Sequence, residues 1–517
     1  MDDQQVHQLM AADRFDHPVG ALRLLETHIS WVLLTGEWAY KIKKPVDFGF
    51  LDFSSLDKRK YCCEEELRLN RRLCPQIYHA VVPVCQGPEG INLKGSGVIL
   101  DHAVKMRQFD PEAILSRLLP TGQVEINAFR QLGYGVAAFH ESAAVAPSDS
   151  PWGTMPAVTA PVRENFIQIE PLLTLQDDRD LLMQLSERAN VQGGVLEALF
   201  YQRRQRGFIR ELHGDLHTGN IALIDGEWLP FDCIEFNPSL RWIDTASDVA
   251  FLLMDLEYLG YSAQANRFLN AYLEYSGDLD LLPLLPYYKA YRAMVRAKVN
   301  QLRLQQPHLE EGALQQLKRE FDGYLQFCQG LASGSRPFLA LMMGVSGSGK
   351  STVAQQVAET TGAIHLRSDV VRKRLFGLKP NQASGSGVDG GIYTSEASRR
   401  TFSQLREDAR RVLEWGLPVI VDATFLSVAG RFPFRELANA CGVPFAIISC
   451  EAEPAELERR ILQRQQEQDA SEADIAVLHN QLDQVEALTQ DEQACRLDSR
   501  SLSVGELARL LIQGNPH

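Results

Sequence analysis

Hydrophobic and polar residues alternate near the N-terminus in a pattern that predicts a β-hairpin. Two strand-like runs, residues 28–34 and 38–44, flank a short turn that contains glycine. Within the second run, a period of two places Lys41 and Lys43 on the same face of the strand. Lysines on a strand face usually point to solvent or protect a sheet edge, so they would matter chemically only beneath a bound nucleotide.

Helical spacing of apolar residues dominates the rest of the first half. Helices are predicted over residues 17–28, 55–73, 127–142, 162–172, 177–190 and 193–209, and through most of 251–327. Strands are predicted over residues 77–84, 98–100 and 104–109. Residues 143–160 are rich in Ala, Pro and Ser, which is typical of a loop. We therefore expect a small, mostly β unit with one helix, followed by a helical unit.

The second half repeats the order strand, loop and helix. Apolar runs of strand length occupy residues 338–343, 363–369, 417–422 and 445–450, and residues 470–517 are predicted to be helical and acidic. This alternation predicts a parallel α/β sheet, whereas the first half is of the α+β class. The expected segments are a small lobe (1–110), a helical large lobe (111–330), a linker (331–337) and an α/β domain (338–517).

Composition and charge narrow the classes of partner. The chain has 517 residues and a formal net charge of −14, which argues against wide nucleic-acid or anionic-membrane surfaces. Its nine cysteines are scattered without paired CxxC spacing, as in a cytoplasmic protein with reduced thiols and no zinc site. The acidic N-terminus does not resemble a signal peptide, and no apolar run approaches the ~20 residues of a membrane helix. We expect a cytoplasmic protein; nothing in the sequence predicts an oligomeric state.

The most specific motif begins at Gly344 and ends at Ser351. It fits the phosphate-binding loop pattern G-x-x-x-x-G-K-[ST] and lies between a predicted strand and a predicted helix. Glycines let backbone N–H groups turn toward a phosphate, and the helix N-terminus adds partial positive charge. Lys350 is expected to reach the β and γ phosphates of ATP, and the Ser351 hydroxyl to hold Mg²⁺. The predicted nucleotide-binding residues are Gly344, Ser346, Gly347, Ser348, Gly349, Lys350, Ser351 and Thr352.

A second informative stretch is His213-Gly-Asp215-Leu-His-Thr-Gly-Asn220. Asp215 and Asn220 are five residues apart, the offset of the kinase catalytic loop H-R-D-x-x-x-x-N. A predicted strand-turn-strand follows and ends near Asp232, where kinases place a metal-binding aspartate. One carboxylate would accept the proton of an attacking hydroxyl, while an amide oxygen and a second carboxylate hold Mg²⁺ across the ATP phosphates.

On these residues, the segment from about 20 to 325 resembles the aminoglycoside phosphotransferase-like kinases, a branch of the protein-kinase-like fold. The resemblance implies Asp215 as catalytic base and Asn220 and Asp232 as Mg²⁺ ligands. It also implies Lys41 as the nucleotide lysine of the small lobe, paired with Glu66 of the following helix.

Two departures from the pattern of that family leave alternatives open. No G-x-G-x-x-G loop precedes the lysine strand, which leaves Lys43 as an alternative nucleotide lysine. The metal motif is Asp-Cys-Ile-Glu in place of Asp-Phe-Gly, so Glu235 is an alternative or additional partner to Asp232. Asp244 and Asp248 resemble the aspartate that braces the large lobe, and we interpret both as structural.

In the second half, two carboxylates follow predicted strands. Ligands of parallel sheets bind off the carboxyl ends of the strands, where Asp369 and Asp422 are expected. Either would receive the proton of an acceptor hydroxyl, and Asp422 would alternatively hold Mg²⁺. Arg460 and Arg464 share a helix face at i,i+4 and are candidates to clamp the transferring phosphate.

Two further features surround this predicted site. Arg372 and Lys373 are candidates to hold an anionic group of the acceptor, with a solvated charged helix turn as the equally weighted alternative. Residues 381–393 are Gly-rich and polar, which predicts a mobile loop that closes over substrate. On the phosphate loop, the two carboxylates and the arginine pair, residues 337–490 resemble the gluconate-kinase/zeta-toxin-like P-loop kinases, which phosphorylate small-molecule hydroxyls.

The leading prediction is an ATP-dependent phosphotransferase with two kinase-like domains, each using ATP and Mg²⁺ to phosphorylate a small-molecule hydroxyl. Two alternatives remain. One is a toxin-like or regulatory kinase that acts on a nucleotide-sugar or a protein. The other is a P-loop ATP switch that gates the phosphotransferase-like half.

Overall fold

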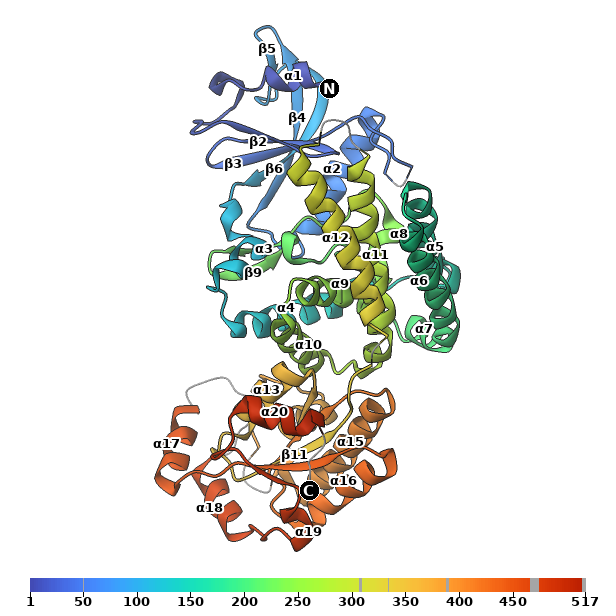
Figure 1. The fold of residues 1–517 in the computed structure, drawn as a ribbon. Helices are drawn as coiled ribbons and strands as arrows, with labels where there is room; N and C mark the ends of the chain where they lie inside the picture. The colour runs from blue at the N-terminus through green and yellow to red at the C-terminus, as the bar shows by residue number, and fades with distance from the viewer. Residues whose placement is uncertain (50, 306–308, 333, 387–389, 465–473, 514–517) are drawn as a thin grey trace. The chain divides into compact units, whose positions relative to one another are not determined.

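The computed structural model describes residues 1–49, 51–305, 309–332, 334–386, 390–464 and 474–513 (Figure 1). The chain divides into two compact units. The first comprises Met1–Glu125, Phe139–Asp255 and Tyr287–Leu309, and the second comprises Ile126–Ala138, Leu256–Pro286 and Glu310–His517. The second unit thus combines the α/β segment with three pieces of the 111–330 segment that the sequence assigned to the large lobe.

The first unit contains a six-stranded antiparallel sheet in the order β1-β2-β3-β6-β4-β5. Its strands are β1 (Arg23–Glu26), β2 (Ser30–Leu34), β3 (Trp38–Lys43), β4 (Tyr78–Gly87), β5 (Gly90–Asn92) and β6 (Val98–Arg107). The predicted hairpin is β2–β3. The predicted helix over residues 17–28 is wrong, because β1 pairs along the edge of β2 and this pairing outweighs a weak helical spacing. The two strands predicted over 98–100 and 104–109 are one strand, β6.

One long helix, α2 (Leu56–Asn70), packs against this sheet and agrees with its prediction. Ser55 caps the helix by accepting a hydrogen bond from the Lys58 amide. The Glu66 side chain is fully buried on the sheet side of the helix. Val6 of α1 (Asp3–His7) and Phe15, which follows the turn η1 (Ala12–Arg14), belong to an apolar cluster with Tyr40 and Ile42 of β3.

From residue 111 to 330 the chain is mostly helical. The elements are η2 (Pro111–Ala113), α3 (Leu115–Leu118), η3 (Leu119–Thr121), α4 (Ile126–Ser142), α5 (Met155–Ile169), η4 (Glu170–Leu172), α6 (Gln176–Val195), α7 (Glu197–Gln205), β7 (Ile209–Glu211), η5 (Thr218–Asn220), β8 (Ile221–Ile224), β9 (Glu227–Pro230), α8 (Pro238–Arg241), β10 (Trp242–Asp244), α9 (Thr245–Tyr258), α10 (Ser262–Ser276), η6 (Leu279–Leu284), α11 (Leu285–Leu304) and α12 (Glu311–Gly330). Helix α5 begins inside the predicted loop, because Thr154 caps it and its first proline lies in the first turn. The helix predicted over 193–209 ends early, and β7 pairs with β10. Asp244 of β10 forms a buried ion pair with Arg203 at 2.8 Å, as expected for a structural residue.

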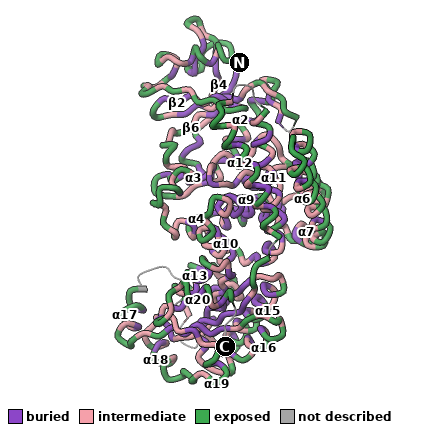
Figure 2. Tube along the Cα trace, viewed as in Figure 1, coloured by how far each residue is buried: buried purple, intermediate pink, exposed green. Residues whose placement is uncertain are grey.

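The α/β segment forms a five-stranded parallel sheet in the order β12-β13-β11-β14-β15. Its elements are β11 (Leu339–Met343), α13 (Lys350–Thr361), β12 (Ile364–Arg367), α14 (Ser368–Leu375), η7 (Gly391–Tyr393), α15 (Ser395–Glu414), β13 (Val419–Asp422), α16 (Val428–Cys441), β14 (Phe445–Ser449), α17 (Pro454–Arg464), α18 (Ile475–Asp483), α19 (Gln490–Gln493), β15 (Arg496–Asp498) and α20 (Val504–Gln513). The central strands are almost wholly buried and are drawn purple in Figure 2. Strand β15 corrects the prediction that 470–517 is helical, since its residues pair along β14.

Candidate active sites

Lys41 and Lys43 converge on one carboxylate of helix α2. Lys41 Nζ donates to Glu66 Oε1 at 2.9 Å and to Asp232 Oδ1 at 2.6 Å. Lys43 Nζ donates to Glu66 Oε2 at 2.7 Å and also to Glu235. This strand face is therefore covered, and the Lys43 side chain is only 1 % exposed. Lys41 thus contacts Asp232, the first candidate metal ligand, and Lys43 contacts Glu235, the alternative candidate.

Burial and ion pairing act in opposite directions on these groups. Burial alone would raise the pKa of Glu66, but the two lysines outweigh it and lower the pKa to about 2. At Glu235 burial dominates and raises the pKa above its ordinary value, although Lys43 acts to lower it. Burial alone would lower the pKa of Lys41, yet Asp232 and Glu66 raise it well above its ordinary value. At neutral pH Lys41 and Glu66 are both charged, which is the state needed to hold a phosphate.

The catalytic-loop segment follows β7 and is held by Asp248 of α9. Asp248 Oδ2 accepts from the His213 amide at 3.3 Å, and Oδ1 accepts from the Gly214 amide at 3.0 Å. His140 Nε2 lies 3.2 Å from the same Oδ2. Gly214 has a φ of 84°, and a Cβ there would lie 2.7 Å from the Leu240 carbonyl oxygen, so glycine is required. The bracing role interpreted for Asp248 agrees with these bonds.

The five-residue offset brings Asp215 and Asn220 together. Asn220 Nδ2 donates to Asp215 Oδ2 at 2.9 Å and to the Asp215 carbonyl at 3.1 Å, and His217 Nε2 lies 3.4 Å from that Oδ2. Burial would raise the pKa of Asp215, but His217 outweighs it and the pKa lies well below its ordinary value. Asp215 is therefore an ionised hydrogen-bond acceptor at physiological pH. The amide oxygen of Asn220 takes part in neither bond, so it suits a metal ligand.

Asp232 has a left-handed backbone conformation, with a φ of 64°. Its amide donates to the Tyr78 hydroxyl at 3.1 Å, and the Cys233 amide donates to Asn70 Oδ1 at 2.8 Å. Such conformations are uncommon for residues other than glycine and cluster at functional sites. The Asp232 side chain is 40 % exposed, which leaves carboxylate oxygen open to a ligand. With the Asn220 amide oxygen it supplies the hard oxygen donors that Mg²⁺ prefers.

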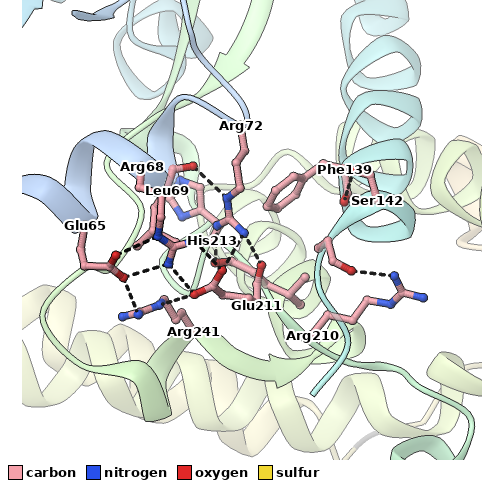
Figure 3. A network of polar contacts seen from close by, with 12 residues as sticks. Glu65, Arg68, Leu69, Arg72, Phe139, Ser142, Arg210, Glu211, His213 and Arg241 are labelled. Carbon is pink, nitrogen blue, oxygen red and sulfur yellow. Dashed lines mark hydrogen bonds and ion pairs between the residues drawn. The ribbon is translucent and has the colours of Figure 1, made fainter. Parts of the chain in front are cut away.

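An ion-pair network joins helix α2 to the strand before the catalytic loop (Figure 3). Glu211 of β7 accepts from Arg68 at 2.7 Å and from Arg241 at 3.1 Å, and its carbonyl accepts from Arg72 at 2.8 Å. Arg241 also donates to Glu65 at 2.9 Å. Glu65 directly precedes Glu66, which binds Lys41 and Lys43. The network therefore fixes these two lysines relative to the catalytic loop. No local sequence signal pointed to it.

The predicted phosphate loop has the backbone of an anion-binding cradle. Gly344, Gly347 and Gly349 have φ values of 149°, 82° and 91°. A Cβ on Gly344 would lie 2.3 Å from a backbone carbonyl oxygen, and one on Gly347 would lie 2.9 Å from another. Glycine is therefore required at both positions. The Ser348 hydroxyl is buried without a hydrogen-bond partner among the described residues, which fits a group that a phosphate oxygen would satisfy.

Lys350 and Ser351 begin helix α13 at the end of this loop. Lys350 Nζ donates to a carbonyl of the loop at 2.8 Å, and Ser351 and Thr352 are exposed. The Ser346 amide donates to Gln481 Oε1 of α18 at 2.7 Å. Gln481 thus contacts the phosphate loop, and the motif could not predict this contact because Gln481 lies 135 positions after Ser346 in the sequence.

The structure brings one of the two predicted arginines to the phosphate loop. Arg460 Nη1 donates to the Gly347 carbonyl at 3.3 Å, and Nε donates to Glu456 at 2.6 Å. The Arg460 side chain is 42 % exposed, so it has room to turn toward a ligand. The side chain of Arg464, at the end of α17, lies outside the described residues.

Asp369 and Asp422 lie at the carboxyl edge of the parallel sheet, as predicted. Asp422 ends β13, and Oδ2 lies 3.2 Å from His365 Nε2. Burial would raise the pKa of Asp422, but His365 and Lys350 outweigh it and lower the pKa to about 2. Arg367 pairs with Asp422 in the sheet register, and Asp369 follows it in the first turn of α14. Asp369 is half-buried.

Arg372 and Lys373 are already engaged with backbone oxygens. Arg372 Nη1 donates to the Ile392 carbonyl at 3.0 Å, and Lys373 Nζ donates to the Pro380 carbonyl at 3.1 Å. Both side chains are buried. These bonds anchor the two ends of the Gly-rich segment, and the expectation that the two side chains hold the acceptor stays a prediction. Part of the loop predicted over 381–393, residues 387–389, lies outside the described residues.

Comparisons with known proteins place the chain in a family. Residues 339–488 match the family described as AAA domain. Over 439 residues the chain is 31 % identical to the uncharacterized protein Rv2004c of Mycobacterium tuberculosis, and the alignment covers 85 % of each chain. The same identity and coverage apply to the uncharacterized protein Mb2027c of Mycobacterium bovis. The chain belongs to the family of these mycobacterial proteins.

Solved structures similar to this family member fall into two groups. A gluconokinase from Sinorhizobium meliloti is 22 % identical and covers 35 % of this chain and 93 % of its own, with a TM-score of 0.25. Amicoumacin kinase hAmiN is 13 % identical and covers 63 % and 94 %, with a TM-score of 0.38. A choline/ethanolamine kinase family protein from Mesorhizobium loti is 15 % identical and covers 60 % and 93 %, with a TM-score of 0.33.

The elements described above identify the two folds directly. An antiparallel sheet with a buried Lys–Glu pair, followed by a catalytic-loop segment and helices, gives the N-terminal region a kinase-like phosphotransferase fold. A phosphate loop on a five-stranded parallel sheet gives the C-terminal region a P-loop kinase fold. Across the described residues, no helix is both long and apolar enough to cross a membrane. Within the same residues, His, Cys, Asp and Glu side chains form no cluster of three or more that could hold a metal.

Proposed function

We propose that this family member is an ATP-dependent phosphotransferase with two active sites, one in each compact unit, and that each site phosphorylates a hydroxyl of a small molecule. The observation that carries the proposal is the 2.6 Å contact between Lys41 Nζ and Asp232 Oδ1, together with the bond from Lys41 to Glu66. It unites a nucleotide lysine, its helix partner and a metal ligand in one charged cluster. Phosphoryl transfer requires such positioning and charge neutralisation above all else.

In the first site, the chain's own residues orient the reactants. Asp232 and the Asn220 amide oxygen would hold Mg²⁺, which offsets the charge of the phosphates when bound. Asp215 accepts a hydrogen bond from the acceptor hydroxyl and aims its oxygen at the γ-phosphorus. Because the pKa of Asp215 is low, the proton passes to it only as the new O–P bond forms. The bond from the γ-phosphorus to the bridging oxygen breaks, and its electron pair leaves with ADP.

In the second site, the phosphate loop supplies the same functions from backbone groups. The backbone N–H groups of this glycine-rich loop and the Lys350 side chain hold the phosphates, and Ser351 would hold Mg²⁺. Arg460, which already contacts the loop, would balance charge that develops on the transferred phosphoryl group. Asp369 or Asp422, at the carboxyl edge of the sheet, would orient the acceptor hydroxyl and receive its proton.

The test uses γ-labelled ATP, Mg²⁺ and a small-metabolite extract with five purified full-length proteins. They are the wild type, Asp215→Ala, Lys350→Ala and two controls that alter exposed residues remote from either site, Asp177→Ala and Lys318→Ala. Labelled products are separated and identified by mass. We expect Asp215→Ala and Lys350→Ala to remove different products, and both controls to match the wild type.

Other results would identify the alternatives. Loss of every product in Lys350→Ala and of none in Asp215→Ala would mean that the first site is a binding domain. Transfer of label to a nucleotide-sugar, or to a protein when a whole-cell lysate replaces the extract, would indicate a regulatory or toxin-like kinase. Hydrolysis of ATP with no labelled acceptor would overturn the proposal and favour an ATP switch.

A further inference from the structure

A polar cavity lies beside the phosphate loop, inside the second compact unit. Its volume is about 130 Å³, and all of its lining residues belong to that unit. Helix α10 and the nearby part of α4 form one side, and helix α13 and strand β12 form the other. Ser351 and Thr352, both exposed, line one end. The cavity therefore reaches the start of α13, where the γ-phosphate of ATP is expected.

Helix α10 is bonded to the sheet as though it were part of the P-loop fold. Asn270 Oδ1 accepts from the His365 amide at 2.8 Å, and Asn270 Nδ2 donates to the Ala363 carbonyl at 3.1 Å. Asn266 Nδ2 donates to the Glu359 carbonyl at 2.9 Å. These bonds fix the wall formed by α10 to β12 and to α13, the two elements of the opposite wall.

The side chains that line the cavity carry an excess of positive charge. Three arginines, Arg130, Arg267 and Arg367, face two glutamates, Glu274 and Glu359. Glu274 is shared, because it lies 2.9 Å from Arg367 and 3.8 Å from Arg130. Two guanidinium groups thus share one carboxylate, and the third arginine lies 3.7 Å from the other carboxylate, Glu359.

Arg267 is that third arginine. Its Nε is buried and has no hydrogen-bond partner among the described residues, and it lies 3.7 Å from Glu359. Its Nη2 makes one long bond of 3.4 Å to Asn127. The side chain is only 12 % exposed, and burial lowers the pKa of Arg267. A buried donor without an acceptor is unfavourable because it has lost its hydrogen bonds to water, and an anion in the cavity would supply the missing acceptor.

We propose that this cavity binds the anionic group of the acceptor that the P-loop site phosphorylates. The acceptor is then a small hydroxylated anion, a carboxylate or a phosphate ester, whose charge lies against Arg267 and Arg130. This inference rests on the proposed function of the second site. The planar guanidinium fork suits either oxyanion.

The size of the cavity limits the ligand further. Its volume of about 130 Å³ is roughly ten times the ~10–15 Å³ that one water molecule occupies on this measure. It is below the ~300–1,000 Å³ of sites that enclose drug-sized ligands. The cavity therefore has room for an anionic group with a few carbon atoms.

The test uses the full-length chain with Asp215→Ala, which silences the first site. A metabolite extract is split on an anion-exchange resin, and both fractions are offered with γ-labelled ATP and Mg²⁺. We expect labelled product from the anionic fraction alone. Pretreatment of that fraction with phosphatase distinguishes a phosphate ester, whose product is lost, from a carboxylate, whose product remains.

Added substitutions test the cavity itself. We measure the concentration of the active anionic fraction that gives half the maximal rate. Arg267→Met is expected to raise this concentration at least tenfold, and Arg267→Lys is expected to raise it less. Neither variant should change the ATP concentration that gives half the maximal rate. Arg399→Met, on the exposed face of α15, is the matched control and should match its parent. If Arg267→Met fails to fold, Arg130→Met replaces it as the test of the cavity. The Arg130 side chain is 28 % exposed, so its substitution should disturb folding less.

Each remaining outcome counts against one proposal or both. Product from the non-anionic fraction, unaffected by Arg267→Met, overturns the inference and leaves the proposed function standing. If the anionic fraction yields product and Arg267→Met needs no higher concentration of that fraction for half the maximal rate, the cavity is not the binding site of the acceptor. The same result in Arg130→Met has this meaning when Arg267→Met fails to fold. No product from either fraction overturns the proposed function of the second site and this inference with it.

Discussion

Replacing Lys43 with Met separates the roles of the two small-lobe lysines. The Lys43 side chain is 1 % exposed and that of its partner Glu235 is 5 % exposed. Removal of one member of a buried ion pair costs about 3–5 kcal/mol, because the other charge stays buried without its partner. Glu66 keeps its bond to Lys41, so the loss falls mainly on Glu235. We expect a loss near 3 kcal/mol, which lowers the folded-to-unfolded ratio roughly 150-fold.

The pH dependence of this loss has a definite sign. Burial already raises the pKa of Glu235, and removal of Lys43 would raise it further. A carboxyl group with a higher pKa in the folded state binds its proton more readily there, so its unfavourable effect is greatest above that pKa and shrinks as the pH falls through it. The deficit of Lys43→Met should therefore be larger at about pH 8 than at about pH 5.5. Lys43→Met combined with Glu235→Gln should recover most of it.

Denaturant unfolding followed by tryptophan fluorescence measures this effect, since five of the six tryptophans lie in the first compact unit. Lys41→Met is the comparison. It should destabilise less, because the Asp232 side chain is 40 % exposed and regains water, yet it should abolish phosphorylation by the first site. The reasoning would be refuted if Lys43→Met were as stable as the wild type, or if Glu235→Gln gave no recovery in the double variant.

Further predictions concern both sites. Asp215→Asn should lower kcat of the first site by about 10²–10⁴ with little change in KM for ATP, as measured by initial rates. Because the pKa of Asp215 lies well below its ordinary value, the first-site rate should show no loss from Asp215 protonation down to about pH 4, where a carboxyl group with the ordinary pKa of about 3.9 would be about half protonated; a fall with that ordinary pKa would contradict this. Glu211→Gln should loosen the arginine network, so that hydrogen exchange in α2 speeds up and first-site kcat falls roughly tenfold; unchanged exchange would count against it. Gln481→Ala should free the Ser346 amide and tighten ADP binding about 2–10-fold by calorimetry, the value of one hydrogen bond; weaker binding would show that Gln481 assists the nucleotide.

Sequence alone predicted the features whose chemistry is local. The phosphate loop requires its glycines within eight consecutive residues, and the structure gives Gly344, Gly347 and Gly349 backbone conformations that favour glycine. The offset between Asp215 and Asn220 is likewise set within one loop, and the two side chains meet at 2.9 Å. Both the phosphate loop and the Asp215–Asn220 pair could therefore be predicted from the sequence without knowledge of any tertiary contact.

Features that depend on distant contacts were not predictable in the same way. Strand β1 was expected as a helix and β15 was not expected at all, because each is a strand only through its pairing with a neighbour. The lysine face of β3 has the pattern of a solvent-facing strand, yet α2 and the Asp232 segment cover it. The Arg–Glu network of Figure 3 joins residues up to 176 positions apart, and no local pattern records such a pairing.

The grouping of α10 with the parallel sheet has a physical basis in strand β12. This strand is at the edge of the sheet, and exposed strand edges tend to pair with other chains. Asn270 satisfies one amide and one carbonyl at β12 with the two groups of its side chain, across 93 positions or more of sequence. Arg367 and Arg374 extend the contact to Glu274 and to carbonyls of α10. A boundary drawn at a Gly/Ser-rich linker follows local composition, whereas the second compact unit includes α10, which makes these bonds. Residues 338–517 without α10 would therefore lack the side chains that contact β12, and Arg267 would be missing from the cavity.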